Sequence, residues 1–235
     1  MDPNDLEQLI AAHETWFKDR SRGARLELEN VTLKDVRIVA RRLIGAKLKN
    51  VDFSGATLIE TEFDRSEMES VFFRGAEMSR ATLSGARLRR VDFANARLDQ
   101  SNFDDVIAND SIFDGTVMDQ SSFVKATLER CSLRAVSLVR GSLRRAHVSR
   151  SSFESGVLRE VDFSHALLVD VDLRKTDLSL AVFREARLGP IHIFGIVGAP
   201  AVVENCGLEQ VDISEPGDGS EYSPNALAAL RTLPR

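Results

Sequence analysis

The sequence has few residues of the kinds that mark secreted or membrane proteins. It contains two Cys, one Trp and one Tyr in 235 residues, and none of its six prolines lies between Asn4 and Gly189. No apolar run reaches the length of a membrane-spanning helix, and the acidic N-terminus lacks the basic and apolar regions of a signal peptide. We therefore expect a soluble protein of the cytoplasm that has no disulfide framework and no membrane association.

Motifs that carry catalysis are absent as well. There is no Gly-rich phosphate loop and no nucleophile elbow, and the four histidines show no ligand-type spacing. Cys131 and Cys206 are interpreted as small core residues and not as a disulfide or metal pair. The sequence thus predicts a protein that is not an enzyme, with no catalytic residues, no cofactor and no metal site.

What the sequence does contain is a repeat with a period of five. Every fifth residue from Leu28 to Ile193 is apolar, and among these residues only Ala108 is small. A period of five belongs to neither regular element, because it turns about 140° per step on a helix and alternates faces on a strand. The chain must therefore turn a corner in each unit, and the apolar residue, called the centre below, must fill an interior.

The position two before each centre is also restricted. It holds small or apolar residues, or Ser and Thr, as at Ala46, Val51, Thr61 and Ser101. Residues two apart in an extended segment point to the same side, so this position also points inward. A hydroxyl there can donate to a neighbouring backbone group. Arg41 is the exception to the restriction on size.

Phenylalanine centres fall into two columns when the units are sorted in a cycle of four. One column holds Phe53, Phe73, Phe93, Phe113 and Phe153, and the column two units away holds Phe63, Phe103, Phe123, Phe163 and Phe183. The other two columns contain no Phe. This arrangement predicts a four-sided coil, with rings from two opposite walls stacked along its interior.

The units AKLKN, VDFSG, ATLIE, ARLRR, VDFAN and TDLSL resemble those of the pentapeptide-repeat proteins, whose loose consensus is A(D/N)Lxx. The resemblance implies an all-β fold, a right-handed quadrilateral parallel β-helix with one unit per wall and four units per coil. The repeats would form about nine coils, in a rod roughly 40 to 45 Å long. Such a rod has two open sheet ends that need covers.

Four segments are expected from this pattern. They are an N-terminal capping helix and linker at 1–25, the β-helix at 26–195, irregular final coils at 196–215 and a tail at 216–235. Apolar residues at helical spacing behind Asp2 and Pro3 predict the capping helix over residues 3–19.

The tail is expected to contain a short helix near residues 225–233. Ser223 and Pro224 suit its N-cap and first turn. Because several relatives form a two-fold contact through this end, the resemblance implies a homodimer. The apolar tail residues that would make this contact are Ala226, Leu227, Leu230 and Leu233.

Charge is distributed unevenly along the repeats. Between Leu98 and Val124 there is no Lys or Arg, and this stretch, which we call the acidic belt, contains Asp99, Asp104, Asp105, Asp110, Asp114 and Asp119. Within it, Ile107, Ile112 and Val117 take an outward position that the family usually fills with Asp or Asn. A basic stretch follows the belt. Two interpretations remain open, a solvated outer wall and a recognition surface for a protein partner.

Two function classes follow from the resemblance. In the first, the chain is similar to the quinolone-resistance and self-immunity members, which bind type II topoisomerase (DNA gyrase or topoisomerase IV) as a DNA mimic. They thereby protect the enzyme from topoisomerase-poisoning antibiotics. In the alternative, the rod is a structural or adaptor protein with no topoisomerase role. Direct binding to nucleic acid is not expected, because the net charge is −5.

Overall fold

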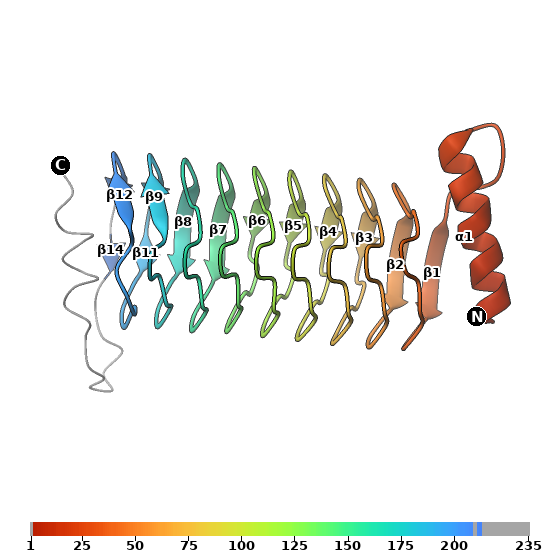
Figure 1. The fold of residues 1–235 in the computed structure, drawn as a ribbon, viewed down its shortest axis with the longest axis horizontal. Coiled ribbons are helices and arrows are strands. Elements are labelled where there is room, and N and C mark those ends of the chain that lie inside the picture. Colours follow the sequence, from red (N-terminus) through yellow and green to blue (C-terminus); the bar gives the residue numbers. More distant parts are fainter. Residues whose placement is uncertain (1, 209–210, 213–235) are drawn as a thin grey trace.

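The computed structural model describes residues 2–208 and 211–212, and it is a rod of stacked coils with a helix across one end (Figure 1). The helix, α1, spans Pro3–Lys18. The strands are β1 Glu27–Thr32, β2 Lys47–Asp52, β3 Glu67–Glu69, β4 Arg87–Arg89, β5 Ile107–Asn109, β6 Thr127–Glu129, β7 His147–Ser152, β8 Leu167–Asp172, β9 Val182–Arg184, β10 Arg187–Leu188, β11 Ile191–His192, β12 Val202–Glu204, β13 Gly207–Leu208 and β14 Val211–Asp212. About nine coils and one N-terminal helix confirm the expected β-helix with its cap.

Each coil consists of four units of the repeat, so that equivalent residues of successive coils lie side by side. Leu28 lies beside Leu48, and Leu48 beside Met68, in a parallel ladder that continues from β1 to β13. The other walls pair mainly through single bridges at the same spacing. Backbone hydrogen bonds join the coils, for example from the Phe53 N–H to the Phe72 carbonyl at 2.7 Å. Proline would remove a donor from these ladders, which accounts for its absence from the interior of the sequence.

The corners are made by the residue two after each centre, which has a positive φ at every such position from Asn30 to Glu185. Glycine takes this position at Gly75 with φ of 62°, but Ala40 and Leu180 also take it, with φ of 53° and 60°. This left-handed conformation is costly for a residue with a Cβ, and most of all for a β-branched one. No Val, Ile or Thr occupies the position from Asn30 to Glu185.

The two phenylalanine columns are confirmed. In the first column, the ring centroids of Phe73 and Phe93 are 5.1 Å apart, and those of Phe93 and Phe113 are 4.9 Å apart, in stacked geometry. In the second, Phe103 and Phe123 stack at 4.6 Å. Rings from the two walls also meet edge to face, as Phe103 and Phe113 do at 6.0 Å. The interior is therefore filled with aromatic contacts in two directions.

Inward hydroxyl groups donate to backbone carbonyls, as the sequence predicts, with the exception of the buried Ser66 hydroxyl, which has no partner among the described residues. Ser101 Oγ lies 3.0 Å from the carbonyl oxygen of Met78, 23 residues before it. Cys131 takes the same place in its own coil, with Sγ 3.5 Å from the carbonyl oxygen of Ala108. Burial raises the pKa of the Cys131 thiol to about 11. Cys131 and Cys206 are both free thiols, and Cys131 fills the core in the role of a small polar residue.

α1 begins as the sequence predicts and ends at Lys18, one residue before the expected end. Asp2 is its N-cap, and the Asp2 side chain accepts a hydrogen bond from the Asn4 N–H at 2.8 Å. Leu6 and Ile10 are buried against the first coil. The helix thus covers the open end of the sheet with an apolar face (Figure 1).

Two polar side chains of α1 serve as acceptors at that open end. The Leu26 N–H donates to His13 Nδ1 at 2.9 Å, and the Arg42 N–H donates to Glu14 Oε1 at 3.2 Å. In later coils, the N–H at the position of Arg42 donates to the coil before it. His13 and Glu14 therefore supply part of what a preceding coil would supply.

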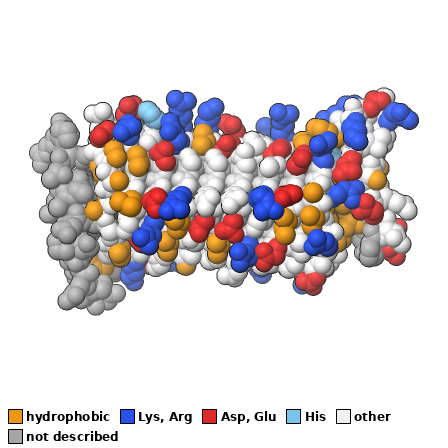
Figure 2. Space-filling view, viewed as in Figure 1, with side chains coloured by type: hydrophobic (Ala, Val, Ile, Leu, Met, Phe, Trp, Pro, Cys, Tyr) orange, Lys and Arg blue, Asp and Glu red, His pale blue; other side chains and the backbone are white. Residues whose placement is uncertain are grey.

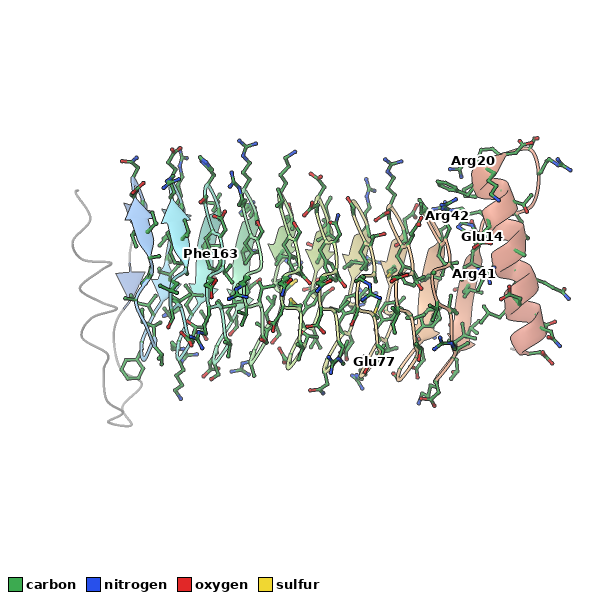
Figure 3. The ribbon with its side chains drawn as sticks, viewed as in Figure 1. Glu14, Arg20, Arg41, Arg42, Glu77 and Phe163 are labelled. Carbon is green, nitrogen blue, oxygen red and sulfur yellow. The ribbon has the colours of Figure 1, made fainter. Side chains whose placement is uncertain are left out.

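The unusual Arg41 also belongs to the cap. Its Nε lies 2.9 Å from Glu14 Oε1 (Figure 3), and its Nη1 lies 2.5 Å from Glu7 Oε1. These contacts raise the pKa of Arg41, and the Arg41 guanidinium lowers the pKa of Glu14. A large side chain fits here because the inward position of the first coil faces a helix and not another coil.

At the C-terminal end, the ladder continues through residues for which the sequence predicts irregular coils. β12 pairs with β9, β13 with β10 and β14 with β11, each in the same register as the coils before them. The short helix expected near residues 225–233 lies outside the described residues.

Candidate interaction surface

The aspartates of the acidic belt surround the rod and do not share one face. Asp104, Asp114 and Asp119 each follow a centre and lie on three different walls, which pair separately with the coils on either side. Asp105 and Asp110 occupy corners, with φ of 55° and 53°. The belt therefore presents carboxylates in several directions around one level of the rod.

Three of these carboxylates are held by the next coil. Asp104 Oδ1 accepts hydrogen bonds from Ser122 Oγ and from the Val124 N–H, the latter at 2.9 Å. Asp114 and Asp119 accept equivalent bonds, from serine hydroxyls at 2.6 Å and from backbone N–H groups at 2.9 Å. All of these donors are neutral. The bonds fix the position of the carboxylates without cancelling their charge.

The remaining carboxylates of the belt differ from one another. Asp110 Oδ1 lies 2.7 Å from Arg130 Nε of the next coil, and this hydrogen bond lowers the pKa of Asp110. Asp99 lies 3.6 Å from Arg97 Nη2. Asp105 is exposed and forms no ion pair with any residue that the structure describes. Among the described residues, Asp105 and the three held carboxylates form no ion pair, so the charge of the belt is least compensated there.

The apolar residues of the belt lie at the same level of the rod but on successive walls. Ile107 is 42% exposed and Ile112 is 37% exposed, while Val117 is half-buried. Each precedes the centre of a different wall, so the three side chains form a ring around the coil and not one patch. Any one partner surface would contact one or two of them together with neighbouring carboxylates.

The arginines that follow the belt are mostly neutralised. Arg140 Nε lies 2.9 Å from Glu160 Oε2, and Arg144 Nη1 lies 3.3 Å from Asp162 Oδ2. Figure 2 shows acidic and basic side chains close to one another along the rod. Exposed pairs of this kind stabilise a fold only slightly, but they offset much of the positive charge of this stretch.

A shallow groove along β1 to β5 was not predicted from the sequence. Its volume is about 590 Å³. The residues of its two rims alternate in charge from coil to coil: Glu27, Lys47, Glu67 and Arg87 on one rim, and Glu29, Lys49, Glu69 and Arg89 on the other. Opposite charges pair along the rims, as Lys49 Nζ and Glu29 Oε1 do at 2.7 Å. The sequence contains a pattern that could have predicted the rims, because the charge at equivalent positions changes sign every four units. Its structural role is to form ion pairs between neighbouring strands.

Within the described residues, no group of three His, Cys, Asp or Glu side chains lies close enough to hold a metal ion. No helix in that part of the chain is long and apolar enough to cross a bilayer. The candidate dimer residues Ala226, Leu227, Leu230 and Leu233 lie outside the described residues, and the dimer contact stays a prediction.

A family model for pentapeptide repeats matches residues 42–75, 76–115 and 157–189, with eight copies. The chain is a pentapeptide-repeat protein. The β-solenoid of this family is typically a structural or protein-binding fold, so the outer walls of this pentapeptide-repeat protein are its candidate functional surfaces.

No curated protein matches this pentapeptide-repeat protein in sequence. Among solved structures it is similar to HetL, a pentapeptide repeat protein involved in heterocyst differentiation regulation in the cyanobacterium Nostoc sp. strain PCC 7120. The two share 19% identity over 88% of this chain and 97% of that chain, with a TM-score of 0.35. Trypsin-treated QnrB1, a plasmid-mediated fluoroquinolone resistance protein, shares 18% identity over 70% of this chain and 92% of that chain, with a TM-score of 0.41. A pentapeptide repeat protein of the Arabidopsis thaliana thylakoid lumen shares 24% identity over 52% of this chain and 65% of that chain, with a TM-score of 0.29.

Proposed function

We propose that this pentapeptide-repeat protein is a non-enzymatic rod that binds a protein partner through its acidic belt. The observation that carries the proposal is the set of neutral hydrogen bonds that hold Asp104, Asp114 and Asp119. A carboxylate that is already fixed loses little conformational freedom when a cation of the partner contacts it. Its uncompensated charge also attracts a basic surface from a distance.

For the partner we propose a type II topoisomerase, DNA gyrase or topoisomerase IV, in the cytoplasm. The belt would occupy a basic surface that otherwise holds DNA phosphates, and the bound rod would protect the enzyme from topoisomerase-poisoning antibiotics. Support comes from the likeness of the repeats to the gyrase-protecting members and from carboxylates at fixed positions around a rod. Duplex DNA carries about one negative charge per 1.7 Å. The proposed mimicry is therefore local, and it rests on the belt carboxylates that form no ion pair with a described residue: Asp104, Asp105, Asp114 and Asp119.

The test uses the purified protein in a gyrase supercoiling assay, with and without a quinolone. The informative variant changes Asp104, Asp114 and Asp119 to Asn together, because Asn keeps an acceptor oxygen for the coil and removes only the charge. Charge reversal to Lys would remove the acceptors as well and would weaken the coil. We expect the Asn variant to fold normally and to lose both inhibition of supercoiling and protection.

A matched control lies two coils earlier on the wall of Asp104. Asp64 accepts hydrogen bonds from Thr82 Oγ1 at 3.0 Å and from the Ser84 N–H at 2.7 Å, in the same arrangement but outside the belt. Asp64→Asn should therefore leave activity unchanged. Equal loss in the control variant, or full protection by the triple variant, would contradict a role for the belt.

An adaptor role is the second candidate, and the exposed Ile107 and Ile112 favour it. Apolar side chains at outward positions suit a protein contact that does not depend on charge. If the protein affects neither gyrase nor topoisomerase IV, this role predicts that Ile107→Ser with Ile112→Ser weakens binding to the true partner. Val157→Ser is the control, since Val157 is similarly exposed, at 38%, but lies away from the belt.

A further inference from the structure

The outer side of the cap carries a cluster of aromatic and cationic side chains. Trp16 and Phe17 are half-buried in the last turns of α1. The guanidinium carbon of Arg20 lies 3.6 Å from the centroid of the Trp16 ring and 5.6 Å from that of Phe17. The guanidinium of Arg42, from the first coil, lies 5.5 Å from the centroid of Phe17. Figure 3 shows Arg20 near the C-terminal end of α1, with Arg42 between it and the coil.

Arg42 is neutralised as the arginines of the walls are, because its Nε lies 3.0 Å from Glu62 Oε2, but two other cations at this end of the rod are not. Arg20 and Arg22 form no ion pair with any residue in the described ranges. The acidic residue between α1 and these arginines, Asp19, forms no ion pair with either of them; its Oδ1 accepts hydrogen bonds from the Ser21 N–H at 3.0 Å and from Ser21 Oγ at 2.7 Å. A guanidinium that stacks on a ring keeps its N–H edge free for a carboxylate.

The cluster is also held in place from below. The ring of Trp16 stacks on the buried His13, with centroids 5.4 Å apart. The hydrogen bonds from Arg41 to Glu14 fix α1 to the first coil. Trp16 is thus placed between His13 on one side and Arg20 on the other, so its position is set before any partner binds. Pre-organised Trp and Arg side chains dominate the binding energy of many interfaces.

We propose that Trp16, Phe17, Arg20 and Arg22 form a binding site for an acidic segment of a protein partner. Carboxylates of the segment pair with the open N–H groups of the arginines, and an apolar residue beside them packs on the exposed edges of Trp16 and Phe17. The site is separate from the acidic belt, because it has the opposite charge and lies about four coils away, or roughly 20 Å. It does not depend on the function proposed for the belt.

The experiment uses the intrinsic fluorescence of Trp16, which is the only Trp of the chain. The probe is an acetylated peptide of Asp and Glu with one Leu, titrated into the full-length protein at low and at high salt. We expect a saturable change in Trp16 emission that weakens as salt rises. The matched peptide, with Asn and Gln in place of Asp and Glu, should cause no such change.

The variants that test the site are Arg20→Gln with Arg22→Gln, compared with Arg65→Gln. Arg65 is an exposed arginine of the wall without an ion pair to a described residue, so it controls for loss of positive charge. We expect affinity for the acidic peptide to fall by about tenfold or more in the double variant, as for a lost charge-assisted contact. The Arg65 variant should bind as the native protein does, and thermal unfolding should be the same in all three.

Five results would overturn the proposal, and four of them concern binding. They are no response to the acidic peptide, an equal response to the neutral peptide, an equal loss in Arg65→Gln, and tighter binding of a duplex oligonucleotide through the same arginines. The fifth is a Trp16 signal that depends on the protein's own concentration. It would indicate that the site binds a second copy of the chain and not an acidic partner.

Discussion

Replacement of Phe113 by Ala tests the interior of the rod where its aromatic contacts are densest. Phe113 is fully buried, with 0% of its surface exposed. Its ring stacks on Phe93 at 4.9 Å and meets Phe103 and Phe123 edge to face at 6.0 Å and 6.3 Å. Loss of a buried Phe costs about 3–5 kcal/mol, and aromatic pairs add about 0.5–1.5 kcal/mol each. We expect the free energy of unfolding to fall by about 5 kcal/mol.

Phe153→Ala is the matched control. Phe153 lies on the same wall and is equally buried, but it makes no ring contact with any described residue, and its column neighbours are Leu133 and Leu173. This variant should lose about 3 kcal/mol, from burial alone. Urea unfolding followed by circular dichroism measures both losses, and equal slopes confirm that the same surface is exposed. Equal losses at the two positions would refute the contribution of ring contacts, and a loss below about 1 kcal/mol at Phe113 would refute its inward placement.

Two further predictions concern pH and the corners. Burial lowers the pKa of His13 from its ordinary value of 6.5, so the neutral form is the one that stabilises the cap. Unfolding free energy should be constant above about pH 6.5 and should fall by up to about 1.4 kcal/mol per pH unit below it, until the lowered pKa is reached. Denaturant titrations between about pH 5 and 7.5 measure the free energy of unfolding, and His13→Gln should remove its dependence on pH. A free energy of unfolding that does not change with pH in the native protein would contradict the role of His13. Gly75 has φ of 62° and open space where a Cβ would lie, so Gly75→Ala should cost about 1 kcal/mol and Gly75→Val about 2 kcal/mol through backbone strain alone. Equal unfolding free energies for the two variants would show that β-branching is tolerated at the corner.

Much of the fold follows from the sequence because each coil repeats the same local rules. The period of the centres predicts the walls, and the cycle of four units predicts the stacked rings of Phe93 and Phe113. The size restriction two before each centre identifies Arg41 as different, but it does not say why. The reason lies in α1, because Glu7 and Glu14 form ion pairs with the Arg41 guanidinium. The repeat pattern does not predict how the helix is rotated on the first coil.

The acidic belt, too, is only partly predictable from the sequence. Composition identifies its aspartates, but the hydrogen bonds that hold them come from the next coil. Ser122 lies 18 residues after Asp104, and Thr82 lies 18 residues after Asp64. This spacing is constant along the rod and is therefore a usable signal. The contact of Arg20 with Trp16 has no such signal, because the linker that follows α1 obeys no period.

Because each coil lies on the next in a constant register, the number of repeat units between two sites determines how those sites are placed relative to one another. Each coil contacts only its neighbours, so an insertion of four whole units would lengthen the rod by one coil and leave the other coils unchanged. An insertion of a single unit would instead turn every side chain beyond it by one wall, a quarter of the way around the axis. The distance between the cap and the belt thus depends on the number of whole coils between them. The angle between them around the axis depends on how many units are left over after the whole coils are counted.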